Sequence, residues 1–168
     1  MRWHGILLAY HNFGESDRYV QFLTKEKGIV TLLAKGARKS KRRYVGGLDL
    51  FCHDELSVQG HERFYLRELK VINPFWALRS DLNRLLTVGR MVQWVQMIAR
   101  VWPPMMECYY LLGQLIALTE KIETLEEGAF LLLLFRVKLL LSLGIRPRFS
   151  YCVRCNQGLK AGGEHFFI

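Results

Sequence analysis

Hydrophobic and polar residues alternate in short runs along the first 72 residues, in the period-two pattern typical of β-strands. Gly, Asn, Asp and Pro separate these runs and favour turns. Hairpins are indicated at residues 25–28 and 59–62, each of which contains a glycine. Five short strands joined by turns at this spacing predict a small β-sandwich or β-barrel. The predicted strands cover residues 4–10, 18–24, 29–34, 48–58 and 63–72.

The hydrophobic period lengthens to that of a helix after residue 77. Leucine, valine and isoleucine recur at helical spacing over residues 78–101, and Ser80 is the expected N-cap. A second helix is expected over residues 105–118, and its almost uniformly apolar surface predicts burial. The pattern therefore predicts an α+β fold, with a strand domain over residues 1–77 and a helical domain over residues 78–168.

A capping box predicts the start of a third helix. The Thr124 side chain can accept a hydrogen bond from a free backbone N–H while Glu127 reaches back. The apolar run extends to Leu143, and Gly144 supplies the stop. The most apolar part, residues 130–143, is shorter than the ~20 residues of a membrane span and contains two cations. We therefore expect a buried helix rather than a membrane anchor.

Composition adds a strong positive charge to this picture. The 168 residues include 24 Lys or Arg and 15 Asp or Glu, a net charge of +9. Residues 1–80 hold 14 basic and 8 acidic residues, so the strand half carries +6 of that charge. Such a surplus attracts polyanions or an anionic membrane surface. The alternative is a basic soluble protein whose charge serves no ligand.

The cysteine count and the amino-terminal segment indicate the compartment. Four cysteines are too few for a disulfide-stapled secreted domain. The first residues contain a short apolar run but no small-residue cleavage site of a signal peptide. We expect a cytoplasmic protein without a membrane segment.

The densest charge lies between the third and fourth predicted strands. Six of the nine residues from 35 to 43 are cationic, so mutual repulsion predicts a solvated loop. Cations in this arrangement contact phosphates and release their counterions, and small strand modules commonly bind single strands in a cationic groove. The alternative is a solvated loop without a ligand. The predicted phosphate contacts are Lys35, Arg38, Lys39, Lys41, Arg42 and Arg43.

Four aromatic residues near this loop could stack on bases. Alternation places Phe51 and Phe64 in the core. Tyr65 is a further candidate, but Tyr44 directly follows the basic run. We therefore predict Tyr44 as the stacking residue.

The pair Cys152 and Cys155 has the spacing of half a tetrahedral zinc site. His165 is a candidate third ligand, whereas Cys52 and Cys108 fit small core residues better. A redox dithiol would need a thioredoxin-like βαβ context, which the pattern does not show. Zinc bound by Cys152 and Cys155 is therefore a hypothesis that needs further ligands.

Catalytic motifs are not found. The sequence has no glycine-rich phosphate loop ending in Lys-Ser or Lys-Thr, and no zinc-deaminase signature. The glutamates of the helical half fit surface or capping positions rather than a paired acid and base. We expect a protein that is not an enzyme.

Several segments together resemble the bacterial RecO family, in order and spacing over nearly the whole chain. The first four match the amino-terminal module of that family, and the last two match its last long helix and the start of its cysteine motif. These segments are residues 5–8, 13–18, 23–28, 34–38, 135–147 and 152–155.

The resemblance implies an OB-fold barrel followed by a helical domain, in a DNA repair and recombination mediator. Such proteins bind single- and double-stranded DNA without sequence specificity and anneal complementary strands. They act with the partner RecR to load the recombinase RecA onto DNA coated by single-strand-binding protein, in the nucleoid. Some members bind zinc through two Cys-x-x-Cys pairs. The second pair is expected soon after residue 168, so either the chain stops short of it or this region is degenerate.

Other functions stay open at this point. An RNA-binding accessory factor could use the same barrel, and a protein-interaction module could carry its charge only for solubility. An enzyme is the weakest hypothesis.

Residues 13–18 are expected to form a turn and the start of a strand, in a role closer to barrel closure than to DNA contact.

Overall fold

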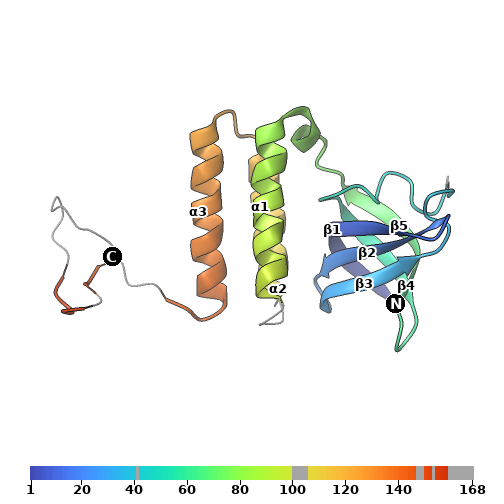
Figure 1. The fold of residues 1–168 in the computed structure, drawn as a ribbon, viewed down its shortest axis with the longest axis horizontal. Coiled ribbons are helices and arrows are strands. Elements are labelled where there is room, and N and C mark those ends of the chain that lie inside the picture. The colour runs from blue at the N-terminus through green and yellow to red at the C-terminus, as the bar shows by residue number, and fades with distance from the viewer. Residues whose placement is uncertain (41, 100–105, 147–149, 153, 159–168) are drawn as a thin grey trace.

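The computed structural model describes residues 1–40, 42–99, 106–146, 150–152 and 154–158. A β-barrel lies beside a group of three α-helices, with the barrel formed by the first half of the chain (Figure 1). The change from strands to helices falls between Asn73 and Trp76, close to the predicted boundary at residue 77. The predicted α+β class is confirmed.

Five strands close into the barrel in the order β1-β2-β3-β5-β4. All neighbours are antiparallel except β3 and β5, which are parallel and pair Leu33 with Tyr65 and Ala34 with Leu66. A five-stranded closed barrel of this kind is an OB-fold, as the resemblance implied. The strands are β1 (Arg2–Phe13), β2 (Asp17–Thr24), β3 (Gly28–Ala34), β4 (His53–Gln59) and β5 (Tyr65–Asn73).

Alternate side chains fill the barrel, as the period of two requires. The buried interior includes Val20, Phe22, Leu32, Leu56 and Leu66. Gly5 on β1 lies against this interior, and a Cβ there would come within 3.0 Å of both Leu56 and Phe22. A side chain at residue 5 would therefore have to push Leu56 and Phe22 aside at the packed centre of the barrel.

The fourth predicted strand was too long at its start. Residues 43–52 form turns over the end of the barrel, and β4 begins only at His53. Leu50, which lies within the predicted strand, is exposed. The chain must bend here because Gly47 packs against Leu69 with no room for a side chain, and Phe51 takes a left-handed φ of 72°. Alternation is not a reliable guide where the backbone leaves the sheet.

The first helix begins one turn later than the pattern predicted. A 3₁₀ turn, η1 (Trp76–Ser80), precedes α1 (Leu82–Ile98), and Asp81 rather than Ser80 is the N-cap. The Asp81 carboxylate accepts hydrogen bonds from the backbone of Asn83 at 2.7 Å and of Arg84 at 3.1 Å. The last predicted residues of this helix, 100 and 101, lie outside the described residues.

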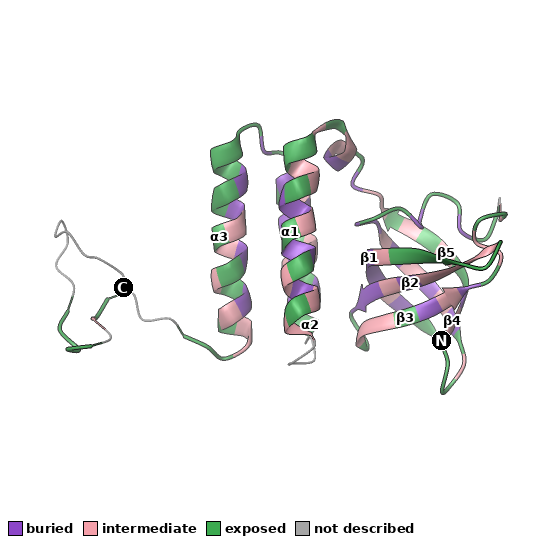
Figure 2. Ribbon diagram, viewed as in Figure 1, coloured by how far each residue is buried: buried purple, intermediate pink, exposed green. Residues whose placement is uncertain are grey.

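The capping box of α3 (Leu125–Ser142) is confirmed, with hydrogen bonds in both directions between Thr124 and Glu127. Gly144 follows with a φ of 78°, as expected of a helix stop. The predicted burial is only partly right. Figure 2 shows that α3 buries the side facing α1, whereas its opposite side is exposed. Phe130 is 64% exposed on α3, and Tyr110 is exposed on α2 (Met106–Thr119). None of the described helices is long and apolar enough to cross a membrane.

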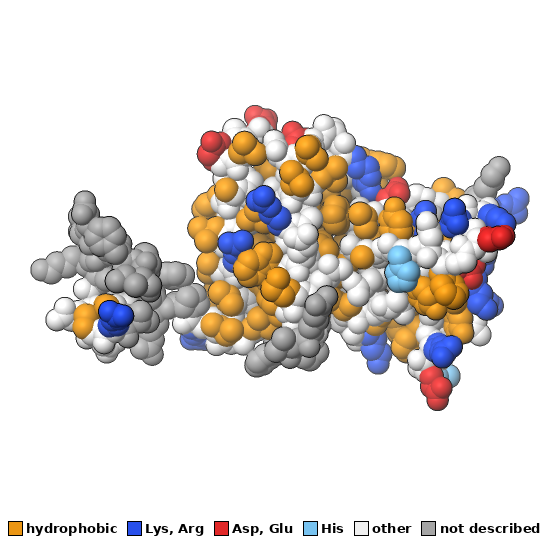
Figure 3. Space-filling model, in the orientation of Figure 1, with side chains coloured by type: hydrophobic (Ala, Val, Ile, Leu, Met, Phe, Trp, Pro, Cys, Tyr) orange, Lys and Arg blue, Asp and Glu red, His pale blue; other side chains and the backbone are white. Residues whose placement is uncertain are grey.

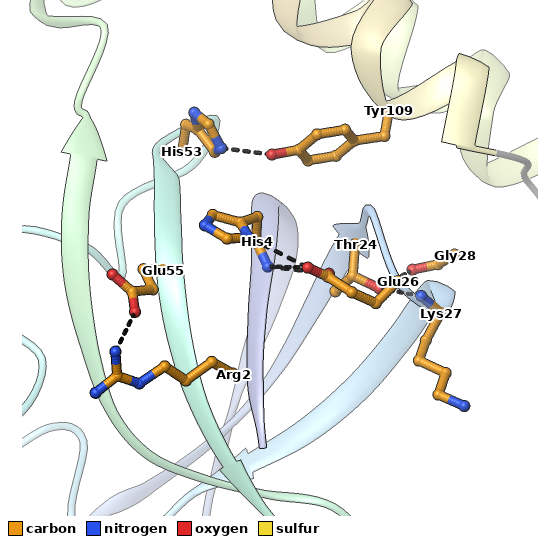
Figure 4. A network of polar contacts seen from close by, with 9 residues as sticks. All are labelled: Arg2, His4, Thr24, Glu26, Lys27, Gly28, His53, Glu55 and Tyr109. Carbon is orange, nitrogen blue, oxygen red and sulfur yellow. Dashed lines mark hydrogen bonds and ion pairs between the residues drawn. The ribbon is translucent and has the colours of Figure 1, made fainter.

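The helices pack on one flank of the barrel. Ile6, Leu8 and Leu23 lie in the same buried cluster as residues of α1, α2 and α3. The contact also contains polar links, since His53 Nε2 lies 2.6 Å from the Tyr109 hydroxyl (Figure 4). Burial lowers the pKa of His53, with a further contribution from His4. The helices therefore cover one part of the outer barrel surface and leave the rest open.

Asp54 on β4 is an unusual member of the barrel interior. Its side chain is fully buried, and neither carboxyl oxygen has a hydrogen-bond partner among the described residues. Burial, with a smaller contribution from the charge of Asp49, raises its pKa to about 8. The carboxyl group is therefore mostly protonated at neutral pH, because an unpaired buried charge is costly.

The unfolding free energy is predicted to fall as the pH rises from about 4 to about 8. Between the ordinary pKa of 3.8 and the folded value of about 8, the folded chain binds more protons at Asp54 than the unfolded chain. At about 1.4 kcal/mol for each unit of pKa difference, the loss amounts to roughly 5 kcal/mol. Urea unfolding across this range is expected to show a flatter profile for Asp54→Asn. The exposed Glu68→Gln variant serves as control, and equal slopes for Asp54→Asn and wild type would contradict the assignment.

Candidate nucleic-acid interface

The basic loop, residues 35–43, leaves the barrel at the end of β3, away from the helices (Figure 1). Its described cations are all exposed, as predicted, and Lys41 lies outside the described residues. None of these cations forms an ion pair with a described carboxylate, since the described ion pairs are Arg2 with Glu55 and His4 with Glu26. The exposed cations are Lys35, Arg38, Lys39, Arg42 and Arg43.

The turn between β1 and β2 holds the start of this loop. The Asp17 carboxylate accepts a hydrogen bond from the Gly36 backbone at 2.8 Å, and this bond is the main reason that the pKa of Asp17 is lowered. The Ser16 carbonyl accepts from the Arg38 backbone at 2.9 Å, and the Glu15 carbonyl accepts from the Arg38 guanidinium at 3.1 Å. Residues 13–18 thus form a turn and a strand start, as predicted, and they also anchor the basic loop.

The two ends of the loop are also tied together. The Arg43 guanidinium donates a hydrogen bond to the Lys35 carbonyl at 2.9 Å, and the Arg43 backbone accepts one from Leu69 at 3.0 Å. Gly36 permits the turn with a φ of 67°. Both ends of the basic loop are therefore held against the barrel.

Tyr44 does not lie where a stacking residue must lie. Its side chain is only 5% exposed and belongs to the barrel interior. Its hydroxyl lies 2.9 Å from the Leu66 carbonyl and 3.3 Å from the Lys35 carbonyl. A buried tyrosine places its ring among apolar side chains and its hydroxyl on a polar partner, so the ring has no face for a base. The prediction of Tyr44 as a stacking residue was wrong for this structure.

Tyr65, the candidate that we ranked below Tyr44, points outward instead. Its half-buried ring lies beside Lys35, whose Nζ is 5.2 Å from the ring centroid. Both residues line a hollow of about 320 Å³ together with Arg43, Arg67 and Gln59. Tyr65 therefore combines an accessible ring with nearby cations, which Tyr44 does not.

Strand pairing brings further aromatic residues to the same surface. His11, Tyr19, Leu33 and Tyr65 follow one another across β1, β2, β3 and β5, and we call these four residues the outer row. The His11 and Tyr19 rings are 5.1 Å apart, and the exposed Phe13 ring lies 4.9 Å from Tyr19. Figure 3 shows a histidine beside hydrophobic side chains on the barrel, with Lys and Arg around them.

Sequence reasoning missed Tyr19 and His11. Alternation in β2 does indicate that Tyr19 faces away from Val20 and Phe22. Only the registers of β1 with β2, β2 with β3, and β3 with β5 show that Tyr19, His11 and Tyr65 share one row.

Cys152 and Cys155 lie in a tight turn. The Cys152 backbone donates to the Gln157 carbonyl at 2.8 Å, and its carbonyl accepts from the Asn156 backbone at 2.9 Å. Backbone N–H groups of Cys155 and Arg154 lower the pKa of the Cys152 thiol. Stabilising a thiolate by N–H donors suits a metal ligand, so the pair fits half a zinc site. No group of three or more metal-binding side chains occurs among the described residues.

The other cysteines do not join this pair. Cys52 and Cys108 are buried, as predicted, and burial raises the pKa of each thiol. His165, the candidate third ligand, lies outside the described residues.

Removing the Asp17 carboxylate is predicted to loosen the basic loop. In Asp17→Ala, the Gly36 N–H loses its acceptor, so the lysines and arginines of residues 35–43 become better trypsin sites. Limited trypsin digestion followed by mass spectrometry is expected to show faster cleavage within the loop. Glu15→Ala, which removes a carboxylate of the same turn that forms no hydrogen bond among the described residues, controls for charge. Equal cleavage rates in the two variants would contradict this role.

Both the barrel half and the helical half of the chain match models of known protein families. The family model described as "Recombination protein O N terminal" matches residues 1–75, and the one described as "Recombination protein O C terminal" matches residues 104–163. Similar curated proteins carry the name "DNA repair protein RecO". That of Anaeromyxobacter sp. (strain K) is 32% identical over 165 residues, covering 96% of this chain and 64% of the relative.

Two further relatives agree. The protein from Acetivibrio thermocellus is 28% identical over 158 residues, covering 94% of this chain and 62% of its own length. The protein from Myxococcus xanthus is 32% identical over 152 residues, covering 89% and 61%. This chain spans about 64% of the length of the first of these relatives. The chain belongs to the RecO family.

Proposed function

We propose that this chain binds single- and double-stranded DNA through its barrel, without sequence preference, and serves DNA repair and recombination by annealing complementary strands. The basic loop carries this proposal, because its described cations are exposed and none is paired with a described carboxylate. The name that its relatives carry, DNA repair protein RecO, supports the same role.

Phosphate contacts are suited to this function. Two complementary strands repel one another, and cations that contact both backbones screen that repulsion. Such contacts release counterions and do not read the bases. Annealing needs no bond to be made or broken, so no catalytic group is required.

The anchoring of the loop strengthens the proposal. Asp17 and the carbonyls of Ser16 and Glu15 hold its first half, and Arg43 ties its second half to Lys35. A loop whose ends are held in place before binding loses less conformational entropy when DNA binds. The exposed cations therefore act as a prepared phosphate-binding surface.

Protein partners form a second part of the proposal. A mediator acts with a RecR-like protein and with single-strand-binding protein to load a recombinase. Exposed apolar side chains on α3, such as Phe130 and Leu133, offer a surface of the kind that protein partners bind.

DNA binding and annealing measured across salt concentrations test the main proposal. Changing Lys39, Lys41, Arg42 and Arg43 to Ala is predicted to weaken binding and to make the salt dependence shallower, by roughly one unit of slope for each phosphate contact removed. The matched control changes four cations of the helical half, so that the net charge falls equally. These are Arg90, Lys121, Lys138 and Arg146.

Two outcomes would contradict the proposal. Unchanged affinity and slope in the loop variant would remove the basic loop from the interface. A clear preference for RNA over DNA of equal length would favour the RNA-binding alternative. Thermal melting of both variants checks that a loss of binding is not a loss of folding.

We also propose that Cys152 and Cys155 hold zinc together with ligands outside the described residues. The lowered pKa of Cys152 supports this proposal, because zinc binds the thiolate form. Elemental analysis of purified protein is predicted to find zinc in the wild type and in Cys108→Ala, but not in the double variant with Cys152→Ser and Cys155→Ser. Zinc retained in that double variant would rule out the pair as ligands.

A further inference from the structure

We infer that the outer row is a stacking platform for the bases of single-stranded DNA, next to the basic loop, which contacts the phosphates of both single strands and duplexes. This inference rests on the proposed DNA binding and assigns base stacking and phosphate contact to different side chains.

The outward face of β2 shows where the helices end and the platform begins. Leu23 is fully buried in the contact with the helices. Gln21, two residues earlier, accepts a hydrogen bond from Gln96 of α1 at 2.7 Å. Tyr19, two residues earlier again, is partly exposed beside His11 and Phe13. The helices therefore stop at Gln21, and the row that starts beyond it is accessible.

Aromatic side chains are unusual on a sheet surface that no other element covers. An outward sheet face without a covering element is usually polar, yet this one contains Tyr19 and Tyr65 in the row. Phe13 beside Tyr19 is 51% exposed. Exposed apolar groups that cluster in this way mark binding surfaces.

The rings are held in place by their neighbours. His11 lies against Tyr19 with 31° between the ring planes, and Phe13 meets Tyr19 edge-on at 62°. The Lys35 ammonium group lies over the Tyr65 ring. Tyr19 and Tyr65 are two strand spacings apart, about 10 Å, so a strand that crosses the row meets one ring after the other.

The charges around the row fit a single strand. Lys35, Arg43 and Arg67 line the hollow beside Tyr65. The phosphates of a strand whose bases stack on the row can therefore contact these cations. Aromatic platforms accept any base, because every base has a π-face. In a duplex the bases are paired and stacked on one another, so no base face is free for a tyrosine. The outer row therefore favours single strands, whereas the basic loop does not distinguish the two forms.

Affinity for single-stranded and double-stranded oligonucleotides of equal length tests the inference. The double variant with Tyr19→Ala and Tyr65→Ala is expected to bind single strands more weakly, by about 5-fold to 100-fold for each stacked base. Duplex affinity is expected to stay within about twofold, and the salt slope to stay unchanged, since no phosphate contact is removed. The variant with Tyr19→Phe and Tyr65→Phe keeps both rings and should keep the single-strand affinity. Tyr110→Ala, on α2, is the control for an exposed tyrosine outside the row.

Each outcome decides the inference. Unchanged single-strand affinity in the alanine variant, an equal loss for both DNA forms, or a phenylalanine variant as weak as the alanine variant would each overturn it. If the alanine variant melts early, Tyr19→Leu with Tyr65→Leu keeps the apolar bulk without a ring and is expected to show the same selective loss. Loop variants that lose both DNA forms while tyrosine variants lose neither would leave the proposed function standing without the platform. A wild type that binds neither form would overturn the proposed function itself.

Discussion

The short parallel pairing of β3 with β5 is the contact on which the arrangement of the barrel surface depends. It joins Leu33 to Tyr65 and Ala34 to Leu66, and the Tyr44 hydroxyl lies between the carbonyls of Lys35 and Leu66 at its edge. This seam closes the barrel, so that β5 becomes the neighbour of β3. As a result, Tyr65 comes beside Lys35, and the outer row continues from β2 onto β5.

The same seam also holds both ends of the basic loop. The loop begins at Lys35, directly after the paired residues, and Tyr44 returns the chain to the seam from the other end. A loop that starts and finishes at one short pairing has little freedom between its ends. The hydrogen bond from Gly36 to Asp17 then fixes its side toward the β1–β2 turn. The pairing of β3 with β5 therefore both closes the barrel and positions the cations of the basic loop.

The sequence predicted the strands and helices better than it predicted the contacts between them. Period-two alternation located all five strands, and the capping box at Thr124 located the start of α3. Both signals are local, so they can be recognised without tertiary structure. The signals failed where distant residues decide the outcome. Ser80 has the chemistry of an N-cap, but the turn at Trp76–Ser80 moves the start of the helix to Asp81.

The candidate site shows the same division. The density of charge at residues 35–43 was visible in the sequence, because it is a property of neighbours along the chain. The choice between Tyr44 and Tyr65 was not, since it depends on which tyrosine hydroxyl reaches the seam and is buried there. Proximity to the basic run favoured Tyr44, whereas accessibility of the ring favours Tyr65. Zinc ligation by Cys152 and Cys155 stays a prediction.

The clustering of cations and the closure of the barrel oppose one another energetically. Six cations in nine residues repel each other, and this repulsion acts on a loop whose ends hold the seam together. The Arg43 guanidinium donates a hydrogen bond to the Lys35 carbonyl and so helps to hold the two ends of the loop together. Asp17 adds a negative charge near Lys35. Salt ions screen the remaining positive charge, and a bound polyanion would neutralise it more strongly. Because a ligand that binds only the folded state also stabilises it, DNA on this loop would strengthen the closure that presents it.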